Sequence, residues 1–170
     1  MATNTSDKKR APIPALKTVL TDPVHFLAFG FGVGVSPYAP GTLGSVWGIL
    51  LAWLTQGFGL PIEIGIAVGL CLIGIYLCGE SSRRLGVHDH GGIVWDEIAG
   101  AYIICLPFPR TIQVLVIAFI MFRVLDIVKP WPIRELDHRL HGGLGIMLDD
   151  ILAALIGAAF LSLAFGAMTL

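Results

Sequence analysis

The sequence predicts an all-α protein, a helical bundle that is integral to a membrane. Of the 170 residues, 55% are hydrophobic and only 14% are charged, and the mean hydropathy is +0.81. Soluble domains carry about 25% charged residues. A small soluble helical protein with an unusually apolar core is the alternative. The net charge of −1 provides no electrostatic basis for binding nucleic acid.

A series of apolar runs, separated by short polar or proline-containing segments, is the third observation behind this fold class. Residues 62–79 and 151–170 are close to the length that crosses a bilayer. The runs at 46–54, 93–106 and 111–122 are shorter. We expect them to continue helically into the charged regions, to tilt, or to enter the bilayer only partway.

The N-terminal part divides from the rest at residue 20. Residues 1–20 are predicted to be a flexible tail or interfacial arm, and residues 21–170 a single helical membrane domain. Asp22 followed by Pro23 indicates a helix start, because the carboxylate caps free N–H groups and proline needs no partner for its nitrogen. A short apolar helix over 24–31 is expected to lie along the membrane surface.

A glycine-rich segment at 30–48 comes next. Its prolines and close glycines exclude a regular helix across 32–41. The spacing is neither the dinucleotide fingerprint nor the P-loop pattern. Thr42 and Ser45, at the start of the helix that follows, nevertheless predict phosphate binding, because a helix start presents N–H groups and hydroxyls. The alternative is a plain tight loop with a helix cap.

An acidic stretch at 88–97 carries two histidines and three carboxylates. Asp96 and Glu97 stand at the start of an apolar run, where charge is costly and tends to mark function. His88 and Asp89 are candidates for orientation or proton transfer. A structural role is the alternative for any lone histidine.

The second charged region follows the run that begins at residue 111. Arg123 and Asp126 are i,i+3 neighbours on one helix face, either as a surface ion pair or as part of a site. Pro130 ends that helix near Val128 or Lys129.

Two further acids, Asp149 and Asp150, precede the last apolar run, where they are expected to favour the helix dipole. Small residues that follow them predict close contact with another helix. These are Ala153, Ala154, Gly157 and Ala158.

The charge distribution predicts the topology. If the turns at 56–61 and 107–110 face one side of the membrane, ten of the eleven Lys and Arg residues face the other, and only Arg110 does not. The positive-inside rule makes that other side cytoplasmic. The same arrangement gathers the acids at the cytoplasmic ends of three helices.

Five carboxylates are therefore predicted to converge: Asp96, Glu97, Asp126, Asp149 and Asp150. Oxygen ligands select hard cations such as Mg²⁺, with Mn²⁺ as a substitute. Arg123 and Lys129 would hold an anion. This combination suits phosphoryl chemistry with a metal-activated water.

Two other functions are alternatives to metal-dependent phosphoryl chemistry. Cys78 and Arg84 have the C-x5-R spacing of cysteine-dependent phosphatases, but Cys78 ends a helix, where the dipole opposes a thiolate. Intramembrane acids also mark ion or substrate translocation. Here, however, the acids gather at one end of each segment, and residues 151–170 carry no charge.

Four blocks, in this order, resemble the phosphatidylglycerophosphatase A family of bacterial membrane lipid phosphatases. They are GVGVSPYAPGTLGS at 32–45, HDHGGIVWDE at 88–97, FRVLDIVKPWPI at 122–133 and HGGLGIMLDD at 141–150. The resemblance implies an all-helical, multi-pass protein of the bacterial inner membrane. It also implies Mg²⁺-dependent hydrolysis of phosphatidylglycerophosphate to phosphatidylglycerol and inorganic phosphate. Another lipid phosphomonoester, or a soluble one, is the alternative substrate.

Overall fold

The computed structural model describes residues 14–87, 90–131 and 142–168, and all regular structure in these ranges is helical. The elements are α1 (Leu16–Thr21), α2 (Pro23–Ala28), the 3-10 turn η1 (Val33–Val35), α3 (Pro40–Thr55), α4 (Leu60–Leu85), α5 (Trp95–Cys105), α6 (Ile112–Val128) and α8 (Gly143–Met168). The predicted all-α class is confirmed.

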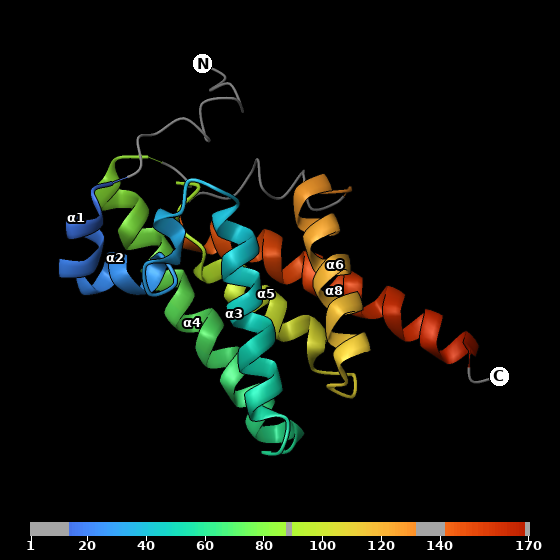
Figure 1. Ribbon diagram of the computed structural model, residues 1–170. Helices are drawn as coiled ribbons and strands as arrows, with labels where there is room; N and C mark the ends of the chain where they lie inside the picture. Colours follow the sequence, from blue (N-terminus) through green and yellow to red (C-terminus); the bar gives the residue numbers. More distant parts are fainter. Residues whose placement is uncertain (1–13, 88–89, 132–141, 169–170) are drawn as a thin grey trace.

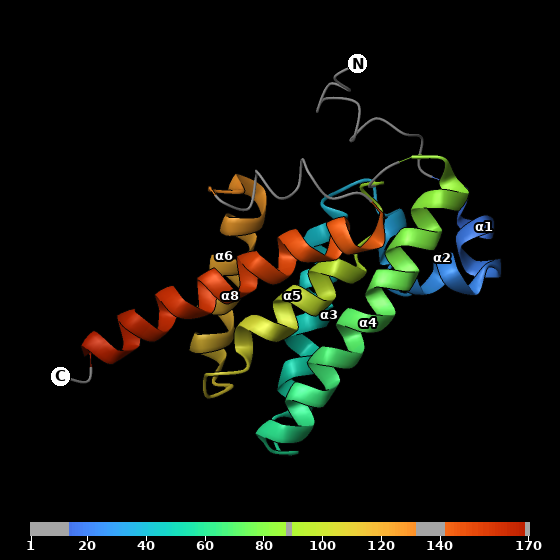
Figure 2. The same ribbon diagram turned by 180° about the vertical axis from the view of Figure 1, so that it is seen from behind.

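The short helix α5 is the centre of the bundle. It packs against α3, α4, α6 and α8, and every one of its residues except Glu97 is buried (Figures 1 and 2). At 1.5 Å per residue its 11 residues extend about 17 Å, which is too short to cross a bilayer core of about 30 Å. α5 is therefore held inside the protein.

The glycine-rich segment forms the contact between α3 and α5. A Cβ on Gly48 would lie 2.3 Å from the carbonyl oxygen of Ile98, and one on Gly44 would lie 2.9 Å from that of Val94. The two backbones approach this closely because neither glycine has a side chain. The helix starts at Pro40, which is a favourable first position, so only residues 40 and 41 of the range 32–41, which was predicted to be non-helical, belong to α3.

Two helices are long and apolar enough to cross a membrane, judged by length and composition: Leu60–Leu85 and Gly143–Phe165. Only 22% of the apolar window in the first is buried. Large apolar side chains such as Ile62, Leu72 and Ile120 are exposed on outward faces. Exposed apolar surface on this scale suits a lipid environment, in agreement with the predicted membrane fold.

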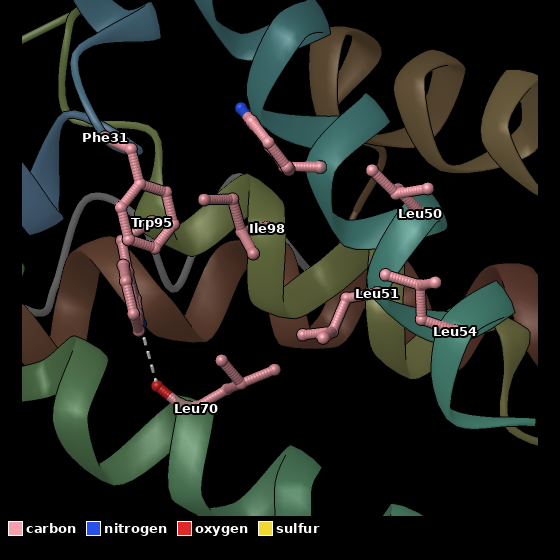
Figure 3. A pocket seen from close by; sticks show the side chains of 8 residues that line it. Phe31, Leu50, Leu51, Leu54, Leu70, Trp95 and Ile98 are labelled. Carbon is pink, nitrogen blue, oxygen red and sulfur yellow. Dashed lines mark hydrogen bonds between the residues drawn. The ribbon is translucent and has the colours of Figure 1, made fainter.

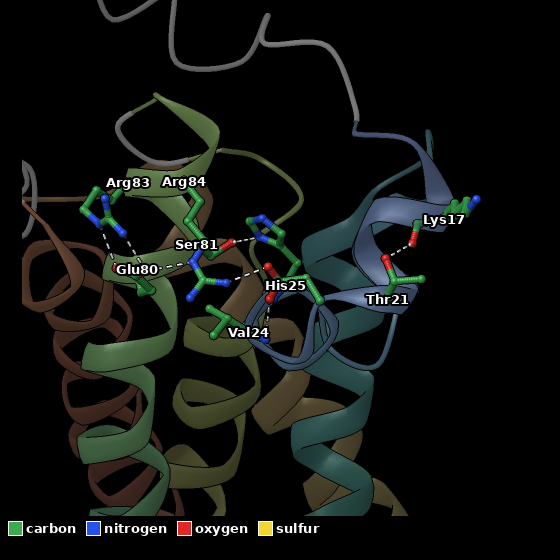
Figure 4. A network of polar contacts seen from close by, with 9 residues as sticks. Lys17, Thr21, Val24, His25, Glu80, Ser81, Arg83 and Arg84 are labelled. Atoms are coloured by element: carbon green, nitrogen blue, oxygen red, sulfur yellow. Dashed lines mark hydrogen bonds and ion pairs between the residues drawn. The ribbon is translucent and has the colours of Figure 1, made fainter.

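The N-terminal helices are attached to the end of α4 by a polar network (Figure 4). Asp22 caps α2 as predicted and forms an ion pair with Arg84 at 2.6 Å. The ring Nδ1 of His25 lies 2.8 Å from the hydroxyl of Ser81. The predicted tail at 1–20 differs from the structure where it is described, since residues 16–20 lie in α1 and Val19 is fully buried.

The predicted end of α6 is confirmed. The helix stops at Val128, and Lys129 adopts a left-handed conformation with φ of 43° before Pro130. The expected position of Asp149 and Asp150 in the first turn of the last helix is wrong, because α8 begins at Gly143. A Cβ on Gly143 would lie 1.8 Å from the carbonyl oxygen of Ile75 in α4, so a glycine is needed where the two helices meet.

The helix ends divide into two groups (Figure 1). The starts of α3, α5 and α8 and the ends of α4 and α6 share one side, drawn at the top, and the connections at 56–59 and 106–111 lie away from it. This grouping agrees with the topology predicted from the charge distribution. It brings the glycine-rich segment and the acidic segments to one end of the bundle.

Candidate active site

Three carboxylates from two helices meet near the start of α5. Asp96, Glu97 and Asp150 each offer an oxygen that lies within 4.8 Å of the others. Asp96 and Glu97 stand in the first turn of α5, and Asp150 comes from α8. The helices meet closely because Gly100 has no side chain: a Cβ there would lie 3.1 Å from the carbonyl oxygen of Asp150.

These carboxylates are nearly excluded from solvent. Asp96 is 7% exposed and Asp150 is 3% exposed. The Oε2 atom of Glu97 and the Oδ2 atom of Asp150 are buried without a hydrogen-bond partner in the part of the chain that is described. Burial, and then the charge of Asp150, raise the pKa of Glu97 well above its usual 4.5. Carboxyl groups gathered in this way repel one another unless protons or a bound cation neutralise them.

The other two predicted metal ligands, Asp126 and Asp149, lie outside this group of three. Asp126 accepts a hydrogen bond of 2.6 Å from Nη1 of Arg123, and Asp149 forms an ion pair with Lys129. Asp126 is near enough for its charge to act on Glu97. A role for Asp126 and Asp149 in metal binding stays a prediction, and the contacts observed are with cationic side chains.

Arg123 provides hydrogen-bond donors beside the three carboxylates. Its Nη1 lies 3.9 Å from Oε1 of Glu97 and also contacts Asp126. Its Nε is buried and, within the described residues, has no partner. A planar guanidinium held in this way suits an oxyanion such as phosphate.

The first turn of α3 closes one side of the site. A Cβ on Gly41 would lie 2.2 Å from Oε1 of Glu97 and 3.2 Å from Nη1 of Arg123. Gly41 was not among the predicted site residues, although its place in the repeat Gly41, Gly44, Gly48 at helical spacing could have identified it. Thr42 is half-buried in the same turn, and its N–H bonds to the carbonyl of Ala39.

Ser45 lies deeper than predicted for a phosphate ligand. It is fully buried, and its hydroxyl donates to the carbonyl of Gly41 at 2.8 Å. This is the usual bond of a helical serine to the preceding turn. Phosphate binding by Thr42 and Ser45 stays a prediction, and Thr42 is the less buried of the two.

The histidine-rich part of the acidic stretch is described only at one end. His88 and Asp89 lie outside the described residues, so their predicted roles in orientation or proton transfer stay predictions. His90 is buried, and its ring Nδ1 accepts a hydrogen bond of 3.0 Å from the N–H of Gly92. That bond shapes the turn leading into α5.

The cluster of three carboxylates (Asp96, Glu97 and Asp150) fits a magnesium ion. Octahedral Mg²⁺ takes oxygen ligands at about 2.0–2.1 Å, so its ligand atoms lie about 3 to 4 Å apart. Oxygens already within 4.8 Å of one another need only small side-chain rotations to reach that geometry. A cation would satisfy the buried oxygens of Glu97 and Asp150 that have no hydrogen-bond partner in ranges 14–87, 90–131 and 142–168.

The fold and the site together define a class of protein. It is a helical protein with membrane-compatible surfaces and a buried carboxylate group. The partly buried cationic side chains of Arg123 and Lys129 lie beside these carboxylates, at one end of the bundle.

The comparisons with known proteins narrow this class. The model of the family described as phosphatidylglycerophosphatase A matches residues 26–165, which include the whole site. Phosphatidylglycerophosphatase A of Escherichia coli is 46% identical over 146 residues, covering 84% of this chain and 83% of that protein. The Haemophilus influenzae protein of the same name is 46% identical over 145 residues, covering 84% and 88%.

A more distant relative has a different name. A Bacteroides thetaiotaomicron protein, provisionally named phosphatidylinositol-3-phosphatase, is 33% identical over 144 residues, covering 79% of this chain and 89% of that protein. No solved structure matches. The chain belongs to the phosphatidylglycerophosphatase A family, and it is a phosphatase.

Proposed function

We propose that the protein hydrolyses the phosphomonoester of phosphatidylglycerophosphate, giving phosphatidylglycerol and inorganic phosphate, with Mg²⁺ as cofactor and Mn²⁺ as a substitute. The names of its two 46% identical relatives support the substrate. One observation carries the chemistry: among the described residues, buried acceptors on Glu97 and Asp150 have no donor, and the buried Nε of Arg123 has no acceptor. A cation and a phosphate bound together would satisfy all three atoms.

Each side chain has a distinct role in this proposal. The ion would be held by Asp96, Glu97 and Asp150. When bound, it would neutralise charge on the phosphate and lower the pKa of a water molecule, so that hydroxide is available for attack. Arg123, oriented by Asp126, would donate hydrogen bonds to the phosphate oxygens.

Two further side chains would complete the phosphate site. Lys129, held by its ion pair with Asp149, would add positive charge, and Thr42 would provide a hydroxyl. The water oxygen bonds to phosphorus and gives up a proton, the bond from phosphorus to the glycerol oxygen breaks, and that departing oxygen takes up a proton to give the alcohol.

The site is proposed to face the cytoplasm from the bacterial inner membrane. Among the described cationic residues, Lys17, Arg83, Arg84, Arg123 and Lys129 belong to the site end of the bundle, whereas Arg110 belongs to the connection at the other end. This bias matches the positive-inside rule. Tyr38 and Trp131, 83% and 82% exposed, flank the same end, as aromatic side chains do at a membrane surface.

The test is phosphate release by purified protein from phosphatidylglycerophosphate in mixed micelles. We expect turnover with Mg²⁺ or Mn²⁺ and none in excess chelator. Phosphatidic acid, phosphatidylinositol 3-phosphate and glycerol 3-phosphate are assayed beside it. Equal turnover in chelator would overturn the metal, and a higher kcat/KM for any of the other esters would overturn the substrate.

A further inference from the structure

An apolar pocket of about 260 Å³ is lined by residues of α3, α4 and α5 and by Phe31 (Figure 3). One face of α3 forms much of its wall, with side chains at helical spacing i, i+3, i+4 and i+7. These are Trp47, Leu50, Leu51 and Leu54. Drug-sized ligands occupy pockets of about 300–1,000 Å³, so this pocket suits a thin apolar object.

The opposite wall belongs to the helix turn that carries the carboxylates. Trp95 directly precedes Asp96, and Ile98 directly follows Glu97. Residues three apart share a helix face, so α5 presents the pocket wall on one face and the acids on others. The indole Nε1 of Trp95 donates to the carbonyl of Leu70 at 3.0 Å, so the polar atom of this side chain is already satisfied.

The pocket runs in the direction that a lipid chain would take. On α3, Gly41 contacts the active site. Counted from Gly41 along the helix axis, Trp47 lies at about 9 Å and Leu54 at about 20 Å. The apolar wall therefore begins a short distance from the phosphate site. It continues toward the opposite end of the bundle, as acyl chains continue from a headgroup into the bilayer.

The pocket also opens to the outside of the bundle. Trp47, Leu50 and Leu54 are partly exposed, so a chain could enter sideways from surrounding lipid. Phe31 borders the mouth, with its ring 6.0 Å from Trp47 and 6.3 Å from Trp95 between centroids. Its φ of 62° is strained for a bulky residue, and such strain is typical of functional positions.

We propose that this pocket receives one acyl chain of the phospholipid whose phosphate is cleaved at Asp96, Glu97 and Asp150. The identity of the chain as substrate rests on the proposed function. The pocket would position the ester at the carboxylates by holding the lipid beside the site. It would also give the enzyme a preference for long-chain over short-chain substrates.

Quenching of Trp95 fluorescence tests occupancy without turnover. A variant with Trp47, Trp53 and Trp131 changed to Phe retains Trp95 alone, which is 7% exposed. We expect phosphatidylglycerol brominated along its acyl chains to quench Trp95 with saturation in detergent. In that background Leu51→Phe, which fills the pocket, should abolish quenching, whereas Leu72→Phe on the exposed face of α4 should not. Absent quenching, or quenching unchanged by Leu51→Phe, would overturn the proposal.

Kinetics then test whether the chain matters to the reaction. In the otherwise wild-type protein, Leu51→Phe should lower the ratio of kcat/KM for dioleoyl over dihexanoyl phosphatidylglycerophosphate about tenfold. Leu50→Phe is the second variant if Leu51→Phe fails to fold, and Leu72→Phe is the control. An unchanged ratio in a folded pocket variant would overturn the role in substrate selection. Absent phosphate release by the wild type would instead overturn the proposed function and leave the quenching result standing.

Discussion

The two ends of the bundle both bury carboxylates, but they do so differently. At the end remote from the site, Glu63 in α4 forms a buried ion pair with Arg110, which also donates to the carbonyl of Phe108 at 2.6 Å. At the site end, Glu97 and Asp150 have buried oxygens for which no residue in the described part of the chain is a hydrogen-bond partner. The comparison teaches that burial of charge alone does not identify a site. Unsatisfied acceptors that lie together do.

The largest expected effect follows from removing a carboxylate at the site end. Asp96→Asn should lower kcat by on the order of 10³-fold or more, because loss of the metal removes several kcal/mol of transition-state stabilisation. The metal-free protein should keep its melting temperature, since one repelling charge has gone. Phosphate release and circular dichroism in detergent measure both.

Glu80→Gln is the matched control, because Glu80 pairs with Arg83 and Arg84 outside the carboxylate group. Its turnover should stay at the wild-type level. Near-wild-type turnover in Asp96→Asn would remove Asp96 from the site.

At the opposite end, the same kind of change should affect stability instead. Glu63→Gln leaves Arg110 buried without its ion-pair partner and should cost about 3–5 kcal/mol. For a protein of this size, that lowers the melting temperature by about 6–20 °C. The folded fraction should retain wild-type kcat/KM. A stable variant with impaired catalysis would reverse the assignment of the two ends.

The two arginines give a smaller contrast. Arg123→Lys removes a planar donor from the proposed phosphate site, and a hydrogen bond to a charged group is worth about 1.5–3 kcal/mol. We expect kcat/KM to fall about 10- to 100-fold. Arg110→Lys should leave kcat/KM unchanged and lower the melting temperature. Equal kinetics in the two variants would argue against phosphate binding by Arg123.

The smallest expected effect is the pH dependence of the polar network around α2. Burial alone would raise the pKa of Asp22, but hydrogen bonds from Arg84 and from the N–H groups of Val24 and His25 hold it below the usual 3.8. Its folded pKa is thus lower than its unfolded pKa. The stability it contributes is therefore present above pH 3.8 and is lost as the pH falls through the lowered value.

Asp22→Asn isolates this charge, because asparagine also caps helices well. The pair is solvent-screened, so the loss at neutral pH should be below about 1 kcal/mol. The difference in melting temperature from the wild type should vanish at acid pH. A difference that persists there would show that the charge is not its cause.

Much of the fold was predictable because helix breaks are local. Pro130 ends α6 next to Lys129 as expected, and Arg123 pairs with Asp126 because i,i+3 spacing fixes their neighbourhood. The placement of the acidic segments at one end of the bundle followed from the alternation of apolar runs and turns, together with the distribution of Lys and Arg. These inferences needed only chain geometry.

What was not predictable depends on contacts between helices. The start of α8 at Gly143 is set by the backbone of α4, so Asp149 and Asp150 lie in the second turn rather than the first. The close packing of α5 and α8 at Gly100 decides which acids face one another. It also decides which acids pair with Arg123 or Lys129. Spacing along the chain carries no such information.

Binding of Mn²⁺, measured by electron paramagnetic resonance on the detergent-solubilised protein, tests the central claim most directly. We predict saturable binding that Mg²⁺ competes away. Affinity should fall at least about tenfold, or 1.4 kcal/mol, in Asp150→Asn and stay unchanged in Glu63→Gln. Absence of specific Mn²⁺ binding to the wild type, or equal affinity in the wild type and Asp150→Asn, would contradict the account.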